Sequence, residues 1–229
     1  MISGETMSKI ILDHGNYQDL ESYRKSLVIY DGTVDFCSRF LKKGDRTIDQ
    51  MIQAARSGKQ NIVEGCMASG TSTETELKLI GVARASFEEL LEDYRDYLRT
   101  HGLPLWGKND PRILSIRELG RQNNNIGETI KASLEQGNNT PELFCNLMIS
   151  LIHQTNYLLD RYLRSLERQF AENGGIRERM HRTRTAGKNI QREKALSLLR
   201  EIYRDLAELN QPSLMEKVVK TAEILKYNW

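Results

Sequence analysis

The apolar positions between Leu20 and Leu41 recur at alternating steps of three and four residues. This spacing returns side chains to one side of an α-helix and predicts a helix that packs along a bundle seam. Gly44 predicts the end of that helix, and Asp45 predicts the start of the next one. A connection this short predicts an antiparallel helix hairpin. The seam consists of Leu20, Tyr23, Leu27, Tyr30, Val34, Cys37 and Leu41.

The same spacing continues through a second helix, from Ile48 to Gly65. Residues 66–72 are small and predict a loop. Thr73 and Glu76 then form a T-x-x-E pattern, which predicts a capping box at the start of a third helix. Gly102 and Pro104 predict its end. Its apolar face comprises Ile80, Ala83, Phe87, Leu90, Leu91, Tyr94 and Leu98.

Residues 103–139 are the least regular part of the chain and predict an insertion. Ile113–Leu119 and Ile126–Leu134 predict short helices within it. Thr140 followed by Pro141 predicts the start of a fourth long helix, because an N-cap residue precedes proline at the first helical position.

No alternating run rich in Val, Ile and Thr occurs, so the sequence predicts no strands. The fold class that follows is all-α: an antiparallel up-down four-helix bundle over residues 17–172, with the irregular insertion 103–139 before helix four and extra C-terminal helices. Residues 173–229 are predicted to form a basic arm and a C-terminal helical suffix. Within the suffix, Ile190–Leu209 predicts a fifth helix, and Pro212 with Ser213-x-x-Glu216 predicts a short sixth.

Composition changes this picture little. The chain has 229 residues, of which 39% are hydrophobic and 28% charged, which is typical of a folded protein. It contains no run of about 18 apolar residues that could span a bilayer. Three cysteines without metal-ligand spacing, and the absence of a basic start followed by an apolar run, predict a soluble cytoplasmic protein with no membrane association.

Charge is distributed unevenly along the chain. Residues 1–160 carry 18 basic and 22 acidic side chains, whereas residues 161–229 carry 15 basic and 9 acidic ones. A basic C-terminal segment on a near-neutral body indicates an anionic partner.

The sequence contains no common catalytic motif. Phosphate-binding glycine loops, a nucleophile elbow and the H-E-x-x-H zinc motif are all absent. One E-x-x-H pattern, from Glu178 to His181, lies among arginines, and a bundle di-metal site needs two such pairs. We therefore expect a protein that is not an enzyme and has no metal, cofactor or catalytic residue.

Basic side chains give the stronger signal. Lys42, Lys43 and Arg46 surround the first predicted turn, and Arg56 and Lys59 lie off the seam of the second helix. In a helix, the arginines of the C-terminal arm would point to several sides, which favours a flexible or wrapping arm. Such side chains bind phosphates by charge-assisted hydrogen bonds and by counterion release. A solubilising, solvated tail is the alternative. The arm residues are Arg177, Arg179, Arg182, Arg184, Lys188 and Arg192.

The stretch Asp45–Leu98 resembles bacterial four-helix bundle proteins related to the large-subunit rRNA intervening-sequence proteins. Two motifs carry the resemblance, A-x-S-x-x-x-N-I-x-E-G and A-R-A-S-x-x-E-L. Further segments are similar to the subgroup with a four-helix bundle suffix domain, so that the resemblance covers roughly residues 17–185. The motif residues are Ala55, Ser57, Asn61, Ile62, Glu64 and Gly65, then Ala83–Ser86, Glu89 and Leu90; the further segments are Ser22–Lys25, Gly44–Asp49, Trp106, Asp110–Arg112, Ile152–Arg161 and Gly174–Arg184.

The resemblance implies a helical protein without a catalytic role. A related branch contains the accessory variability determinants of diversity-generating retroelements, which form barrel-like pentamers and partner a reverse transcriptase and its RNA. By position, the basic surface of that branch would involve Lys42, Lys43, Arg46, Arg56 and Lys59.

Two functions follow as expectations. The first is a homo-oligomer that binds nucleic acid, RNA or DNA and most readily structured RNA, through phosphate contacts of its basic surface and arm. The second is an adaptor or accessory subunit for a partner enzyme such as a reverse transcriptase. They differ in their response to salt, because phosphate binding weakens steeply with ionic strength and an apolar helix contact does not.

Overall fold

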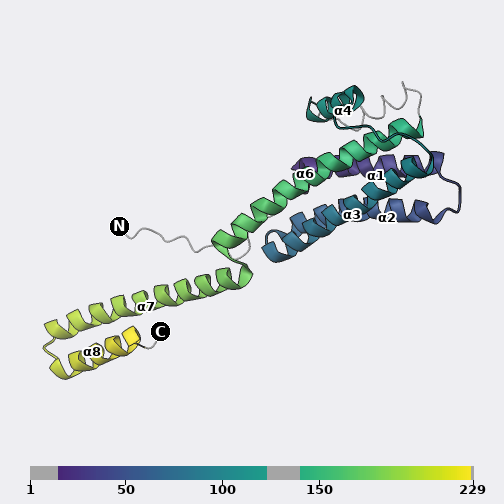
Figure 1. Cartoon of the computed structure of the whole chain (residues 1–229). Helices are drawn as coiled ribbons and strands as arrows, with labels where there is room; N and C mark the ends of the chain where they lie inside the picture. The colour runs from purple at the N-terminus through teal and green to yellow at the C-terminus, as the bar shows by residue number, and fades with distance from the viewer. Residues whose placement is uncertain (1–14, 123–139, 228–229) are drawn as a thin grey trace. The chain divides into compact units, whose positions relative to one another are not determined.

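The computed structural model describes residues 15–122 and 140–227 (Figure 1). All regular secondary structure in these residues is helical, which confirms the predicted all-α class. The elements are a short 3₁₀-helix η1 (Tyr17–Asp19) and the α-helices α1 (Glu21–Phe40), α2 (Arg46–Ala68), α3 (Thr73–Thr100), α4 (Pro111–Gln122), α6 (Pro141–Asn173), α7 (Ile176–Glu208) and α8 (Pro212–Tyr227).

The chain divides into two compact units at the junction between Glu172 and Asn173. The first unit contains η1, α1, α2, α3, α4 and α6 up to Glu172. The second contains α7 and α8.

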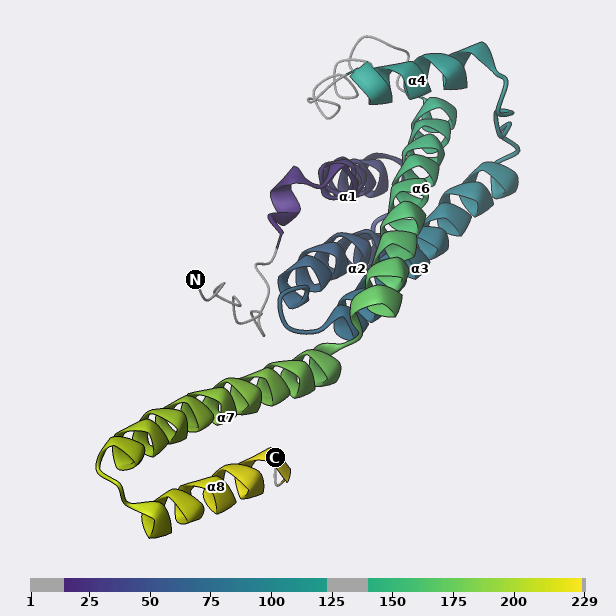
Figure 2. The same ribbon diagram turned by 90° about the vertical axis from the view of Figure 1, so that its left-hand side faces the viewer.

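One hydrophobic core joins α1, α2, α3 and α6, and Figure 2 shows these helices gathered in the first unit. The centre of the core is aromatic: the Phe36 ring of α1 lies 5.1 Å from the Tyr94 ring of α3 and 5.6 Å from the Phe144 ring of α6. All three side chains are fully buried. Since each comes from a different helix, this cluster fixes the helices against one another.

Helices α2 and α3 approach closely where the sequence supplies small residues. A methyl group added at Gly58 would lie 2.6 Å from the Phe87 ring, and one added at Gly65 would lie 3.0 Å from Ile80. Ser57 and Ser86 complete the contact with a hydrogen bond of 2.9 Å between their hydroxyls. Small side chains at these positions therefore have a packing role.

The buried face of α1 differs from the predicted seam. Val34 is exposed, and Tyr23, Leu27 and Tyr30 are only half-buried. The buried face includes hydroxyl residues that satisfy their own hydrogen bonds along the helix, as Thr33 does by donating to the Ile29 carbonyl at 2.7 Å. A seam read from apolar spacing misses such residues, because a Ser or Thr bonded to its own helix can be buried at little cost. The buried residues are Ser22, Lys25, Ser26, Ile29, Thr33, Phe36 and Cys37.

The predicted helix starts are correct for α2 and α6 and displaced by one residue for α3. The Asp45 carboxylate accepts from the Thr47 amide at 2.9 Å, and the Thr140 hydroxyl accepts from the Leu143 amide at 3.3 Å. In α3 the N-cap is Ser72, whose hydroxyl accepts from the Thr75 amide, and not Thr73. The prediction that Thr73 caps the helix is wrong, because the N-cap is Ser72 and Thr73 is the first residue of the helix.

Two further boundaries differ from the sequence expectation. Helix α2 continues to Ala68, so Cys66 lies in the helix and not in a loop. Helix α4 extends over Pro111–Gln122 and contains the predicted helix Ile113–Leu119. The second helix predicted in the insertion, Ile126–Leu134, lies outside the described residues.

Helix α6 is buried on every side from Phe144 to Ile152. A helix that packed only against the other three helices of the core would leave its outer face in water. Here the segment 103–118 supplies a cover: Ile113 of α4 is buried, and Ile116 packs against the core. The insertion therefore extends the core.

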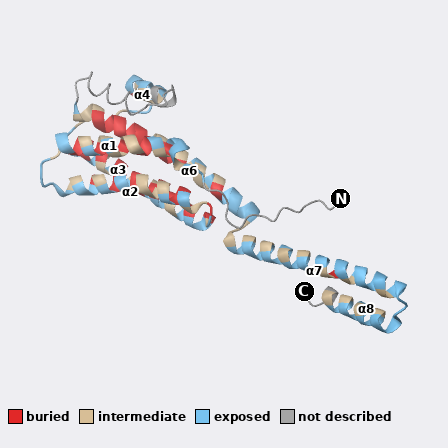
Figure 3. Cartoon of the chain, turned by 180° about the vertical axis from the view of Figure 1, so that it is seen from behind, coloured by how far each residue is buried: buried red, intermediate tan, exposed pale blue. Residues whose placement is uncertain are grey.

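The second unit is a helical hairpin in which α8 folds back beside α7 (Figure 1). Helix α7 begins at Ile176 and not at Ile190, so the predicted flexible arm is part of a continuous helix. Helix α8 begins at Pro212, which places Ser213 inside the helix and not at its cap. Among the side chains described in this unit only Leu196 is buried, as the prevailing blue and tan of Figure 3 show.

Candidate nucleic-acid interface

The predicted basic residues of the first unit form two separate groups. Lys42, Lys43 and Arg46 are exposed at the turn between α1 and α2, where Gly44 adopts a positive φ of 92°. Asp45 lies among them, and its hydrogen bonds from Thr47 lower the pKa of its carboxyl. The turn thus presents three cations around one carboxylate.

Arg56 and Lys59 lie farther along α2. Ten residues separate Arg46 from Arg56, a distance of about 15 Å along a helix. Lys59 is half-buried, and its ammonium lies 4.3 Å from the centre of the Tyr30 ring. Its charge is therefore engaged with α1, and the structure does not unite these two residues with the turn.

A shallow groove of about 610 Å³ follows α2 and α3, but its walls are unsuitable for phosphate. Asp49 and Glu89 line it together with neutral side chains such as Gln53. Carboxylates repel an anionic ligand, so this groove offers no phosphate site. Asn61, one of the resemblance residues, donates from its amide nitrogen to the Ser57 carbonyl at 2.9 Å and has a structural role within α2.

Helix α7 carries the densest positive charge. Between Ile176 and Arg192 it has six Lys or Arg side chains and one acidic residue, Glu178. Glu178 caps the helix, because its carboxylate accepts from the Gly175 amide at 2.9 Å. The E-x-x-H pattern thus has a local structural use, and no group of three or more His, Cys, Asp and Glu suited to a metal occurs in the described part of the chain.

The helical geometry of α7 aligns four of these cations. Arg177, Arg184, Lys188 and Arg192 are spaced seven, four and four residues apart, which places them along one side of a helix over about 22 Å. The predicted flexible arm is therefore a helix, and this helix presents four of its cations along one side. We call Arg177, Arg184, Lys188 and Arg192 the cationic row.

The cations outside the row are held differently. The Arg182 guanidinium donates to the carbonyl of Asn173. Arg179 is half-buried. In contrast, Arg177, Arg184 and Lys188 are exposed, and no ion pair involves them among the residues that the structure describes. These three side chains can reach an external anion.

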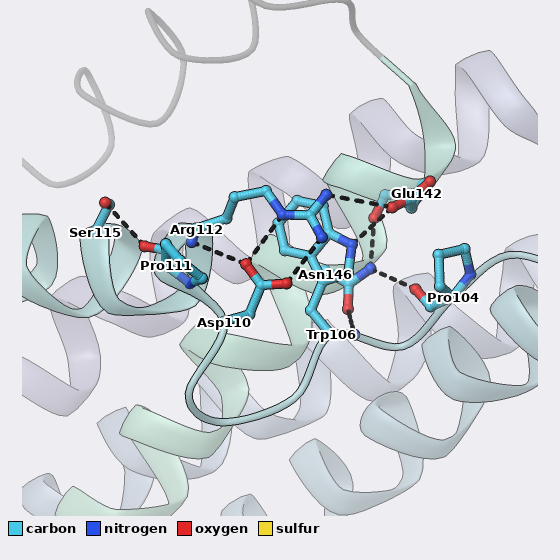
Figure 4. A network of polar contacts seen from close by, with 8 residues as sticks. All are labelled: Pro104, Trp106, Asp110, Pro111, Arg112, Ser115, Glu142 and Asn146. Atoms are coloured by element: carbon cyan, nitrogen blue, oxygen red, sulfur yellow. Dashed lines mark hydrogen bonds and ion pairs between the residues drawn. The ribbon is translucent and has the colours of Figure 1, made fainter.

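Sequence reasoning assigned no role to a polar network at the start of the insertion (Figure 4). The Arg112 guanidinium lies 3.7 Å from the Trp106 ring centre and pairs with Asp110 at 2.8 Å. The Trp106 indole donates to Glu142 of α6 at 2.6 Å. Arg112 also lowers the pKa of the Asp110 carboxyl through its hydrogen bonds.

The centre of this network is Asn146, which is fully buried in α6. Its carbonyl oxygen accepts from the Trp106 amide at 2.8 Å, and its amide donates to the carbonyls of Pro104 and Glu142 at 3.0 and 2.9 Å. The network fixes the insertion to α6. Trp106 and Asp110–Arg112 occur among the resemblance segments, but a pattern of single residues cannot reveal contacts across 40 positions.

Two further titratable groups of the first unit, Glu76 and Cys37, are buried in the packing. Glu76 is 3% exposed and accepts from the Tyr162 hydroxyl at 2.5 Å, and burial raises the pKa of its carboxyl. Burial likewise raises the pKa of the Cys37 thiol to about 11. A thiol with a raised pKa is a poor nucleophile at neutral pH.

Comparisons of the chain with protein-family models, with curated proteins and with solved structures gave no match. No helix in the described residues has both the length and the apolar character needed to cross a membrane.

Proposed function

We propose that the protein is a non-enzymatic helical-bundle protein that binds structured RNA through phosphate contacts. The single observation that carries the proposal is the cationic row of α7, with three exposed side chains that have no described ion pair. Arginine and lysine bind phosphates strongly, and release of counterions from the nucleic acid adds to the affinity.

The first unit supports this function as a folded scaffold. We propose that α1, α2, α3 and α6 form an antiparallel up-down four-helix bundle of the kind that the resemblance implies, and that this bundle associates as a homo-oligomer. The shared core of these four helices supports the arrangement. Lys42, Lys43 and Arg46 would then offer a second, smaller phosphate site.

We favour binding to the shape and phosphates of a structured RNA over binding to a specific base sequence. Residues 177–192, which carry the cationic row, include no Phe, Tyr or Trp for base stacking. A helix with dispersed cations suits the phosphates of a folded RNA. We therefore expect weak dependence on sequence and strong dependence on salt.

The test is fluorescence anisotropy with a labelled RNA hairpin over a range of NaCl concentrations. The triple variant Arg177→Glu, Arg184→Glu, Lys188→Glu should weaken binding at least tenfold at low salt. It should also reduce the slope of log K against log[NaCl] by about 2 to 3, because about 0.7 to 0.9 of slope is lost for each phosphate contact.

The matched control is the triple variant Lys42→Glu, Lys43→Glu, Arg46→Glu, which changes the same number of charges in the other unit. A larger loss in this variant would move the interface to the turn. RNA binding that is absent in the wild-type protein at low salt would contradict the proposal and leave the adaptor function, with a protein partner such as a reverse transcriptase.

A further inference from the structure

The hairpin of α7 and α8 leaves apolar side chains in solvent. The exposed apolar side chains include Leu198 and Ile202 of α7, Leu209 at the C-cap of α7, and Leu214 and Ile224 of α8. A two-helix hairpin with so small a core is expected to be marginal by itself, because most helical stability comes from burying an amphipathic face. These five residues, which we call the apolar stripe, require explanation.

The five residues share one side of the hairpin. The pocket between the two helices is lined by Leu196, Leu199, Arg200 and Tyr203 of α7 and by Val218, Val219 and Ala222 of α8. At about 100° per residue, the α7 part of the stripe is offset from the middle of this lining by roughly a third of a turn, and the α8 part is offset by about the same angle in the same sense. Because the helices are antiparallel, equal offsets place both parts on one side.

The apolar stripe is confined to the paired part of the hairpin. It reaches from the connection at Leu209–Gln211 to Leu198 on α7 and to Ile224 on α8. Farther toward the N-terminus of α7 the same side carries Gln191, Lys188 and Arg184, and beyond them a single exposed apolar residue, Met180. The stripe therefore has the dimensions of a second hairpin of the same length.

Charge along the edges of the stripe is complementary. Glu201 and Asp205 flank it on the outer side of α7, and Lys217 and Lys220 flank it on the outer side of α8. Residues equally far from the connection lie at the same level, which brings Glu201 level with Lys220 and Asp205 nearly level with Lys217. Within one chain these pairs lie on opposite edges and cannot meet.

We infer that the apolar stripe is the interface of a two-fold dimer in which a second copy of this hairpin packs face to face and parallel to the first. The two-fold axis runs along the helices, so α7 of each copy lies against α8 of the other. Leu198 then meets Ile224 of the second copy, Leu209 meets Leu214, and the Glu201 edge meets the Lys220 edge. The result is an intermolecular bundle of four helices with alternating directions.

Charge selects this arrangement over the other two-fold packing. Rotating the second hairpin about an axis across the helices would place α7 against α7, with Glu201 and Asp205 of both copies along one edge. Like charges at an interface disfavour that packing.

The test is sedimentation equilibrium of the full chain at physiological salt over a hundredfold range of protein concentration. The wild-type protein should associate through the hairpin, and the double variant Leu198→Glu, Ile202→Glu should weaken that step at least tenfold. The mass of this variant reports any association through the first unit, and the limiting ratio of wild-type mass to variant mass should be two. The monomer has a mass of 26.4 kDa.

Ala207→Glu is the matched control, because Ala207 is exposed and its separation of nine residues from Leu198 places it on the opposite side of α7 from the stripe. It should leave association unchanged, and circular dichroism should show equal helix content in all variants. Equal masses for the wild-type protein and the stripe variant, equal loss in Ala207→Glu, or a ratio other than two would each overturn the inference.

An exchange of charges tests the register. Glu201→Lys and Lys220→Glu should each weaken dimerisation, because each places like charges at both symmetric edges. The double exchange should restore it to within about threefold of the wild-type value. Lys220 also pairs with Glu216 in its own helix at 2.8 Å. The variant Glu216→Gln, which removes this pair alone, is therefore measured beside the two single exchanges. Failure of the double exchange to rescue would contradict the parallel register. The inference is independent of RNA binding, and its tests contain no RNA.

Discussion

Gly58 shows how one side chain sets the distance between two helices. The Phe87 ring lies where a Cβ atom would project from this position, and both residues are buried. Gly81 in α3 is the opposite case, because a methyl group added there would meet nothing within 4 Å. Substituting the two glycines therefore distinguishes the effect of helix packing on stability from the effect of helix propensity.

We expect Gly58→Ala to lower the free energy of unfolding by about 1–3 kcal/mol, because overpacking against a buried ring outweighs the gain in helix propensity. Gly81→Ala should raise it by about 0.5–1 kcal/mol, because only the propensity changes. Urea unfolding followed by circular dichroism measures both. An equal effect of the two substitutions would show that α2 and α3 are not held at this distance.

Asp93 is a half-buried carboxyl in α3 whose pKa is raised from 3.8 to about 6, first by burial and then by Glu89 and Asp96. The folded protein thus holds this proton more tightly than the unfolded chain does. The resulting stability is present at low pH and is lost as the pH rises from about 4 to about 6.

Asp93→Asn should therefore raise the free energy of unfolding above the pH of that transition by about 1–2 kcal/mol. Below about pH 4 the two proteins should be equally stable, because the carboxyl is then neutral in both folded and unfolded chains. Urea unfolding across this pH range gives the measurement. Asp31→Asn, at an exposed position of α1, is the control, and a similar pH-dependent gain in it would contradict the assignment.

At the scale of elements, the connection between α3 and α6 is fixed by specific hydrogen bonds and not by regular structure. The fully buried Asn146 side chain accepts a hydrogen bond from one backbone amide and donates to two carbonyls. Trp106 and Arg112 stack above it, so that the start of the insertion and α4 are attached to α6.

Asn146→Ala should lower the free energy of unfolding by about 2–4 kcal/mol, since it leaves the Trp106 amide and the Pro104 carbonyl without their partner. Trp106 fluorescence, measured with Trp229→Phe as background, should shift to the red. Ser115→Ala removes an exposed hydroxyl that bonds to the Pro111 carbonyl, and it should change stability by less than about 0.5 kcal/mol. A stable Asn146→Ala protein with unshifted fluorescence would show that the network is dispensable.

At the scale of the whole molecule, the two units differ in how they hold their helices. The first has a core with contributions from four helices, whereas the described part of the second buries one side chain, Leu196. The second unit also carries the cationic row, on the N-terminal half of α7, and the apolar stripe, on the C-terminal part of α7, the connection and α8. The proposed RNA binding and the inferred dimer can therefore be abolished independently, by charge reversal in the row or by glutamate in the stripe.

The sequence by itself determined the helical class and most helix ends, because capping residues, glycine and proline act on their own neighbours. Asp45, Thr140 and Pro141 mark helix starts for this reason. It also located the basic residues, but it placed those of the arm on a flexible chain, since charge density alone does not reveal a helix that continues from Ile176.

Only the tertiary structure decided which sides of the helices are buried. Val34 is exposed and Thr33 buried, because partners such as the Tyr94 hydroxyl, 3.0 Å from Thr33, come from a distant helix. The Asn146 network and the two sides of the hairpin depend in the same way on residues far apart in sequence. Local spacing specifies what a helix can bury, and the neighbouring helices decide what it does bury.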